Sequence, residues 1–284
     1  PQLIKNHKVV GISKNKIKSS KNFISSNIDL TNKNLKIKNG YTNIIHMAAH
    51  SDVTYCNLNP TKCYDLNVKS TQKMLEIARK KDSNFIFLSS SHVYGNLIKQ
   101  PILENSVCTP STHYASSKKM SEILCETYSK TYGLNIQIAR LFSVYGPRSP
   151  KSNLIFNIID QITNNSKIIL GNTYPKRDFI FVSDVITGLI KILNSKKKGF
   201  QVYNIGSGKS ISVDEVVKNC FTISNKKLKI ISSKEKRRKN EIMDIQANIS
   251  KMKNEFNWKT EISLKKGLEM TYNHYISKTL IKKF

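Results

Sequence analysis

Short apolar runs alternate with longer segments of helical periodicity along the first half of the chain. The runs have the length of buried strands, and they lie at residues 8–12, 23–28, 43–47, 84–88 and 135–142. Apolar residues spaced three and four apart predict helices over 59–81 and 112–132, with Pro60 near the first start and Gly133 after the second end. Strands that alternate with helices are typical of βαβ units, so we expect an α/β fold with a doubly wound parallel sheet.

The rhythm changes after about residue 150, where the predicted elements become shorter. They are expected at 154–162, 167–170, 178–181, 184–193, 213–220, 228–231, 249–256 and 264–275. We therefore expect two domains. The first spans 1–150 and also receives roughly 178–206, and the second is a smaller, mixed α/β domain that lies mainly in 151–284.

Composition narrows the range of partners. The 284 residues carry 47 Lys and Arg against 19 Asp and Glu, a formal net charge of +28, but only six of the basic residues are Arg. The lysines are spread over the whole chain, which indicates solvated faces and no nucleic-acid partner. No apolar run reaches the about 18 residues of a membrane span, so we expect no membrane partner. The five Cys lack metal-ligand spacing, which predicts no metal site and reduced thiols in a cytoplasmic protein.

The sharpest candidate for chemistry is Tyr114-Ala-Ser-Ser-Lys118, inside a predicted helix. A spacing of four places Tyr114 and Lys118 on one helix face, one turn apart. A phenol with a pKa of about 10 is a poor base at neutral pH. A neighbouring ammonium favours the phenolate, so this pair can act as an acid and a base. The preceding strand ends in Ser89-Ser-Ser91, and ligands of doubly wound sheets bind at the carboxyl ends of strands.

Further motifs accompany this pair in a fixed order. They are His46-Met-Ala-Ala49, Asn67-Val-Lys-Ser-Thr71, Ser90 before Val93-Tyr-Gly95, Arg140-Leu-Phe-Ser-Val-Tyr-Gly-Pro-Arg148, Arg177-Asp-Phe-Ile-Phe-Val-Ser-Asp184 and Tyr203-Asn-Ile-Gly-Ser-Gly208. From about His7 to Tyr275 the chain resembles the extended short-chain dehydrogenases/reductases, in particular the NAD-dependent nucleotide-sugar epimerase/dehydratase family. The resemblance implies a Rossmann-like dinucleotide-binding domain at 1–150 and a mainly substrate-binding domain at 151–284.

The resemblance also implies a role for each matching position. Tyr114 is the catalytic base, Lys118 lowers its pKa and holds the nicotinamide ribose, and Ser90 contacts the sugar O4. Cofactor contacts are implied for Ser13, Lys14, Asp29, Leu30, Ala48, Ala49, Ser89, Tyr114 and Lys118. Substrate contacts are implied for Ser91, His92, Ser143, Arg177 and Arg238. The two arginines would clamp the diphosphate of a nucleotide-diphosphate sugar, a bidentate task that suits guanidinium. The family further implies a homodimer.

The sequence departs from the family at the cofactor site. The Gly-rich phosphate fingerprint is absent, residue 1 is Pro, and the first segment reads as the end of a helix. We therefore expect an N-terminal truncation that removes the first strand and the Gly-rich loop and impairs activity. Ser13 stands where NAD-specific members usually place Asp, and Lys14 adds a cation. We expect NAD as the cofactor, with NADP as the alternative.

Three functions remain open. Family dehydratases carry Asp-Glu just after the Ser/Thr, and here Ser91 and His92 take those places, which disfavours a 4,6-dehydratase. The helix that begins at Tyr114 resembles sugar 4-epimerases, although Arg148 stands where uronate epimerases usually have Trp. The first hypothesis is therefore a 4-epimerase of UDP-hexose type that oxidises C4 transiently with bound NAD. The alternatives are an NADP-dependent 4-keto-sugar reductase and a truncated, non-catalytic sugar-nucleotide-binding domain.

Overall fold

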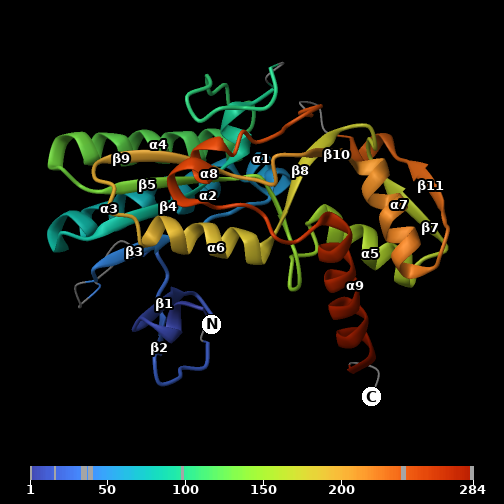
Figure 1. Cartoon of the computed structure of the whole chain (residues 1–284), viewed down its shortest axis with the longest axis horizontal. Helices are drawn as coiled ribbons and strands as arrows, with labels where there is room; N and C mark the ends of the chain where they lie inside the picture. Colours follow the sequence, from blue (N-terminus) through green and yellow to red (C-terminus); the bar gives the residue numbers. More distant parts are fainter. Residues whose placement is uncertain are drawn as a thin grey trace. The chain divides into compact units, whose positions relative to one another are not determined.

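The computed structural model of the chain describes residues 2–15, 17–32, 37, 41–96, 99–237 and 241–281 (Figure 1). Residue contacts divide the chain into two compact units. The first comprises 1–89, 112–138 and 192–201, and the second comprises 90–111, 139–191 and 202–284. The functional division at residue 150 that the sequence predicts stays a prediction.

The largest sheet has four strands in the order β3-β4-β5-β9. They are β3 (Asn43–His46), β4 (Asn84–Ser90), β5 (Ile136–Leu141) and β9 (Phe200–Ile205). β3 and β4 run parallel, with Asn43 opposite Asn84. Consecutive residues of β4, from Phe85 to Phe87, are buried, so both faces of this strand are covered. The strands predicted at 43–47, 84–88 and 135–142 are thus confirmed, whereas β9 was not predicted as a strand.

A second pair of parallel strands lies nearer the N-terminus. β1 (Val9–Ser13) and β2 (Phe23–Asn27) pair from Val9 opposite Phe23 to Ser13 opposite Asn27. The carboxyl ends of these two strands therefore lie side by side. The sequence predicted both strands, and it predicted the end of a helix where the structure has a short 3₁₀ turn, η1 (Leu3–Lys5).

Apart from the first, the helices of the first unit follow the predicted periodicity. They are α1 (Val53–Leu58), α2 (Pro60–Tyr64), α3 (Ser70–Lys81) and α4 (His113–Tyr132), and Figure 1 shows α3 and α4 along the strands of the sheet. A π-helical turn, η2 (Asp65–Lys69), joins α2 to α3, so the predicted helix over 59–81 is one helical run with a local irregularity. α4 begins at Thr112, whose side chain accepts from the Ala115 amide at 3.2 Å, and ends at Gly133 with a φ of 69°.

The second unit is a mixed α/β assembly. β8 (Lys176–Phe181) is the central strand of a three-stranded sheet, parallel to β6 (Ser143–Tyr145) and antiparallel to β10 (Ser210–Ser212). β7 (Lys167–Leu170) and β11 (Lys229–Ser232) form a parallel pair. Buried side chains from α5 (Leu154–Asn164), α7 (Val213–Ser224) and α9 (Leu264–Ile281) pack with β7 and β8 in one apolar core.

Neither a membrane-spanning helix nor a disulfide occurs in the part of the chain that the structure describes. Among those residues, no helix is long and apolar enough to cross a bilayer. The five cysteines form no disulfide with one another.

A buried carboxylate joins two helices of the second unit. Asp184 lies in the first turn of α6 (Val182–Leu193) and is 2% exposed. Its two carboxylate oxygens accept from the amides of Glu261 (3.2 Å) and Ile262 (3.1 Å), and its carbonyl accepts from the Trp258 indole (3.2 Å). The segment that follows α8 (Ser250–Phe256) is therefore fixed to α6.

Replacing Asp184 by Asn leaves one acceptor oxygen and turns an amide N–H₂ toward a backbone N–H. We expect D184N to lower the free energy of unfolding by about 2–3 kcal/mol, measured by urea denaturation, because a buried donor loses its partner. The control is D214N, since Asp214 forms an exposed pair with Lys218 at 2.7 Å and should lose less than about 0.5 kcal/mol. Equal losses in the two variants would contradict this role of Asp184.

Candidate active site

Lys118 is a buried lysine in the middle of α4. Its side chain is 4% exposed, and Nζ donates to the Leu88 carbonyl at 2.7 Å. Nζ also lies 4.7 Å from the centroid of the Phe87 ring. Burial lowers the pKa of Lys118 to about 8. The ammonium is therefore held against the carboxyl-terminal half of β4, and it is charged at neutral pH.

Tyr114 lies one turn before Lys118, on the same face of α4, as the spacing predicted. It is 8% exposed and packs with Cys56 of α1 and Cys63 of α2. Burial raises the pKa of the Cys56 thiol, so this neighbour is uncharged. Two buried cysteine side chains are therefore among the neighbours of Tyr114 in the first unit.

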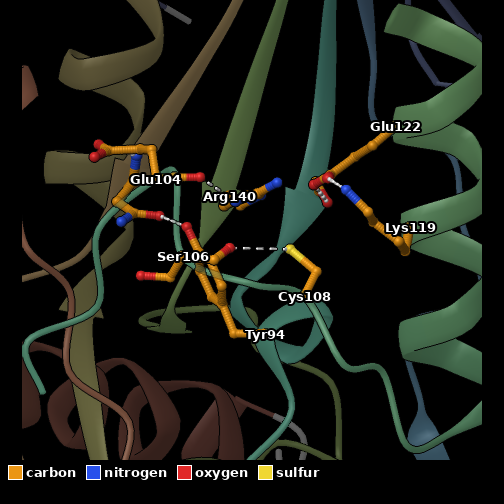
Figure 2. A network of polar contacts seen from close by, with 9 residues as sticks. Tyr94, Glu104, Ser106, Cys108, Lys119, Glu122 and Arg140 are labelled. Atoms are coloured by element: carbon orange, nitrogen blue, oxygen red, sulfur yellow. Dashed lines mark hydrogen bonds and ion pairs between the residues drawn. The ribbon is translucent and has the colours of Figure 1, made fainter. Parts of the chain in front are cut away.

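The sequence left one acidic residue of α4 without a role. Ser89, a predicted cofactor contact at the end of β4, donates from Oγ to Glu122 Oε1 at 2.6 Å. Glu122 is 2% exposed, and its Oε2 lies 3.4 Å from Lys119 Nζ, as Figure 2 shows. Glu122 follows Lys118 by one helical turn, so its spacing was visible in the sequence, but its partner on β4 was not.

Asn67, on the π-helical turn η2, fixes the loop that carries Ala48 and Ala49. Its Nδ2 donates to the His50 carbonyl at 3.0 Å, and the His50 amide donates to its Oδ1 at 2.7 Å. Nδ2 also lies 2.9 Å from Ser117 Oγ on α4. The two alanines predicted to line the cofactor therefore lie, half-buried, in a loop that is tied to the helix of Tyr114.

Three of the predicted cofactor residues meet at the carboxyl ends of β1 and β2. Ser13 ends β1, and the next residue, Lys14, pairs with Asp29 at 3.0 Å. The carboxylate of Asp29 accepts from the Thr31 amide at 2.9 Å and from its hydroxyl at 2.7 Å. These bonds, followed by the one with Lys14, lower the pKa of Asp29 to about 2. The cation that the sequence predicted at Lys14 thus has a carboxylate beside it.

The next residue, Leu30, lies in a turn that a lysine of α3 holds in place. Leu30 is 6% exposed. Lys73 Nζ donates to the carbonyls of Leu30 (3.2 Å), Thr31 (3.1 Å) and Asn32 (2.8 Å). An ammonium has three N–H donors, and all three have an acceptor in this turn. Lys73 therefore positions the turn that carries the predicted cofactor residue Leu30, a role that spacing alone did not indicate.

The predicted substrate residues belong to the second unit. Ser90, 6% exposed, accepts from the His92 amide at 3.3 Å and so caps a 3₁₀ turn, η3 (Ser91–Tyr94). Ser91 is 3% exposed and His92 is half-buried.

The remaining substrate residues lie on neighbouring strands of one sheet. Ser143 opens β6 opposite Phe179 of β8, and Arg177 lies two residues before Phe179. Arg177 is partly buried, 3.6 Å from Glu241, and donates to the Lys176 carbonyl at 2.8 Å. The predicted second arginine, Arg238, lies outside the described residues.

A buried arginine holds the segment that leads into α4. The guanidinium of Arg140 lies 4.7 Å from the centroid of the Tyr94 ring and donates to the Glu104 carbonyl at 2.8 Å (Figure 2). The Tyr94 hydroxyl donates to Asn204 at 2.7 Å, and the Asn204 amide donates to Glu104 at 3.0 Å. This network of the second unit ties Glu104, in the loop that follows η3, to Tyr94 at the end of η3 and to Asn204 of β9.

The Tyr-Lys pair on its helix, beside a parallel sheet, defines a member of the extended short-chain dehydrogenases/reductases. A family model described as "GDP-mannose 4,6 dehydratase" matches residues 4–271. The chain therefore belongs to this family of nucleotide-sugar epimerases and dehydratases, as the motifs predicted.

Two similar proteins carry the names of sugar epimerases. The chain is 33% identical to a "UDP-glucuronate 4-epimerase" of Thermodesulfobacterium geofontis, over 91% of this chain and 81% of the relative. It is 34% identical to a "Putative UDP-glucose 4-epimerase" of Methanocaldococcus jannaschii, over 92% of this chain and 86% of the relative.

A solved structure confirms the predicted Rossmann-like fold. It is that of UDP-glucuronic acid 4-epimerase from Bacillus cereus in complex with UDP-glucuronic acid and NAD. The two chains superpose with a TM-score of 0.85 at 26% identity, over 98% of this chain and 94% of the other.

The buried ammonium predicts a pH dependence of stability. The pKa of Lys118 is about 8 in the folded chain, below the ordinary lysine value of 10.5. Between these values the unfolded chain binds more protons than the folded chain, so the free energy of unfolding rises with pH. Relative to K118M, the wild type should gain up to about 3 kcal/mol between pH 8 and 10.5.

Urea denaturation of the wild type and K118M across this pH range measures the difference in their free energies of unfolding. Contributions from the other lysines and the tyrosines are common to both chains and cancel in that difference. If the two curves ran parallel, the buried ammonium would have an ordinary pKa and the description of Lys118 would be wrong.

Proposed function

We propose that the chain is an NAD-dependent nucleotide-sugar 4-epimerase with Tyr114 as the acid and base at the sugar O4. The observation that carries this proposal is the pairing of Tyr114 and Lys118 on one face of α4, with the ammonium of Lys118 fixed to β4. The names of the two epimerase relatives support a UDP-sugar as substrate.

Lys118 supplies the charge that this chemistry needs. A proton leaves the sugar O4 at neutral pH only if a base accepts it, and a fixed cation one turn away stabilises the phenolate form of a tyrosine. Lys118 is bonded to the Leu88 carbonyl and buried, so its field acts with little screening. Tyr114 takes the O4 proton while C4 loses hydride, and it returns the proton when the 4-keto sugar is reduced on the other face.

When bound, NAD accepts the hydride from C4 and gives it back. The carboxyl ends of β1 and β2 fit the adenosine end of this cofactor, because Asp29 and the buried Leu30 lie there in a turn that Lys73 holds. Lys118 and Ser89 support the nicotinamide end. The 284 residues contain no Gly-x-Gly-x-x-Gly sequence. The proposed NAD site therefore rests on the residues at its adenosine end and at its nicotinamide end.

The pairing of Lys14 with the Asp29 carboxylate supports NAD rather than NADP. Lys14 pairs with Asp29, whose bonds to Thr31 keep it ionised. A carboxylate beside the adenosine ribose repels a 2′-phosphate and can accept from a 2′-hydroxyl. A reductase that draws on external NADPH is therefore the less supported reaction.

Arg177 is the proposed partner of the diphosphate. A partly buried guanidinium presents paired N–H donors to phosphate oxygens, and Ser143 lies on the neighbouring strand. Glu241 faces Arg177 at 3.6 Å, so binding of a diphosphate at Arg177 involves an exchange of anionic partners.

The residues after Ser90 support epimerisation over dehydration. An epimerase needs one acid and base at O4, whereas a 4,6-dehydratase also needs groups that act at C5 and C6. Ser91 and His92 provide no carboxylate at the positions where family dehydratases have Asp-Glu. The proposed reaction therefore needs no side chain that acts at C5 or C6.

We expect Y114F to lower the rate of epimerisation by about 1,000-fold, because the phenylalanine has no hydroxyl to exchange the O4 proton. The assay incubates the chain and NAD with UDP-glucose and with UDP-glucuronate, and separates the C4 epimers. Y132F is the matched control, since Tyr132 lies on the same helix and is 52% exposed.

Turnover that survives in Y114F would contradict the assignment of the base. Binding of the UDP-sugars without any turnover in the wild type, even with excess NAD, would instead favour a non-catalytic sugar-nucleotide-binding domain.

A homodimer through α4 is also proposed. Met120 and Ile123 are 47% and 52% exposed and lie three residues apart on α4, so they form an apolar strip on its outer side. Apolar side chains that repeat on one side of a helix suit packing against a second helix.

We expect I123E to convert a dimer of the wild type to a monomer, because a charge would be buried in the interface. Light scattering coupled to gel filtration measures the mass. M270E on α9, where Met270 is 40% exposed, is the control and should stay dimeric. A wild type of monomeric mass would contradict the proposal.

A further inference from the structure

Two side chains of α4, one turn apart, hold two consecutive residues of β4. Lys118 donates to the Leu88 carbonyl at 2.7 Å, and Glu122 accepts from the Ser89 hydroxyl at 2.6 Å. Tyr114, Lys118 and Glu122 follow one another at intervals of four, so they lie on one face of the helix. Ser90, the proposed contact of the sugar O4, follows Ser89 directly in the chain.

Glu122 is also the acidic group in the surroundings of the Lys118 ammonium. The ionisable side chains around Lys118 come from four elements: Tyr114, Glu122 and Cys125 of α4, Cys63 of α2, Cys56 of α1 and His46 of β3. Burial raises the pKa of the Cys56 and Cys125 thiols, and it lowers the pKa of His46 to about 3. These three neighbours are uncharged at neutral pH.

We propose that Glu122 is a positioning residue of the reaction, which keeps the Lys118 ammonium charged and holds Ser89 at the end of β4. The part that concerns catalysis rests on the proposed function, because the charge on Lys118 acts on Tyr114. The part that concerns Lys118 itself does not depend on any activity.

Burial explains why a counter-charge is needed. An ammonium that loses its water is disfavoured relative to the neutral amine, and a carbonyl oxygen and an aromatic ring offset only part of this cost. A carboxylate in the same buried region favours the ammonium through a weakly screened interaction. Lys119, whose side chain is 30% exposed, pairs with Oε2, while Oε1 faces Ser89.

Two variants separate the charge of Glu122 from its hydrogen bond. E122Q keeps an oxygen that can accept from Ser89 and removes the charge. S89A removes the hydrogen bond and keeps the charge. The matched control is E126Q, since Glu126 lies one turn further along α4 and forms an exposed pair with Lys130 at 2.6 Å. E122D, which keeps the charge on a shorter side chain, is the conservative variant.

The first measurement is the pH at which the free energy of unfolding begins to rise relative to K118M. In the wild type this occurs near pH 8, the pKa of Lys118. E122Q should move it down by about one pH unit, because Lys118 loses its proton more readily without the carboxylate. S89A, E122D and E126Q should leave it in place. This experiment needs neither NAD nor sugar.

The second measurement is the pH profile of epimerisation. Loss of the Lys118 proton should reduce kcat on the basic side, so the basic limb of E122Q should fall about one pH unit earlier than that of the wild type. KM for the UDP-sugar should change less than about twofold, since Glu122 is proposed to act through Lys118 and not on the sugar itself. S89A should lower kcat without moving the limb.

An unshifted onset of the stability rise in E122Q would overturn the proposal, whatever the activity of the chain. A wild type without epimerase activity would refute the proposed function but leave this first readout intact. An E122Q chain that is unfolded at pH 7 and folds near pH 9.5 supports the proposal, because neutral Lys118 needs no counter-charge. An E122Q chain that is unfolded at both pH values would overturn it.

Discussion

The first unit depends on a lysine ammonium that is buried between α4 and β4. Lys118 loses its hydration there, and the Leu88 carbonyl and the Phe87 ring replace only part of it. This constraint explains the composition of the inner side of α4. Four further polar residues of this helix are also buried, namely Ser117, Ser121, Glu122 and Ser129. A helix with a polar buried face is stable only where each polar group finds a partner, and the partners come from η2, β4 and the chain after α4.

The second unit is organised by buried carboxylates in the same way. Asp178, which follows the proposed diphosphate ligand Arg177, is fully buried. It accepts from the amides of Ser207 (2.6 Å), Gly208 (2.9 Å) and Ala247 (3.0 Å). A rigid support beneath Arg177 keeps a long side chain in place for an anionic ligand. Gly206 lies so close to Asp178 that an added Cβ would meet its Oδ2 at 2.8 Å, which accounts for the glycine in this motif.

The sequence predicted those features that arise locally. The apolar run of β4 and the Thr112 and Gly133 ends of α4 are short-range signals, and the structure has each of them. The Tyr114–Lys118 pair follows from helical spacing alone. Among the strands and α-helices, those not predicted are β9, α1, β6 and β10. Each has six residues or fewer, which leaves little periodicity to detect.

The residues that support the candidate site without having been predicted have partners that are distant in the sequence. Glu122 meets Ser89 across 33 residues, Asn67 meets Ser117 across 50, and Lys73 meets the turn at Asn32 across 41. Only the fold brings such pairs together. The pairing of Lys14 with Asp29 also depends on the fold, because it joins the ends of two adjacent strands. It places a carboxylate beside the cation that led to the NADP alternative in the sequence analysis.

In the proposed reaction, the sugar C4 loses a hydride and the same carbon receives it back on the other face. The most direct test is to supply UDP-glucose that carries deuterium at C4, with NAD and in ordinary water, and to analyse the C4 epimer by mass spectrometry and NMR. We predict that the product keeps its deuterium at C4, since the hydride does not exchange with solvent. An epimer that has lost the label to solvent, or deuterium that accumulates in free NADH beside a 4-keto sugar, would contradict the account.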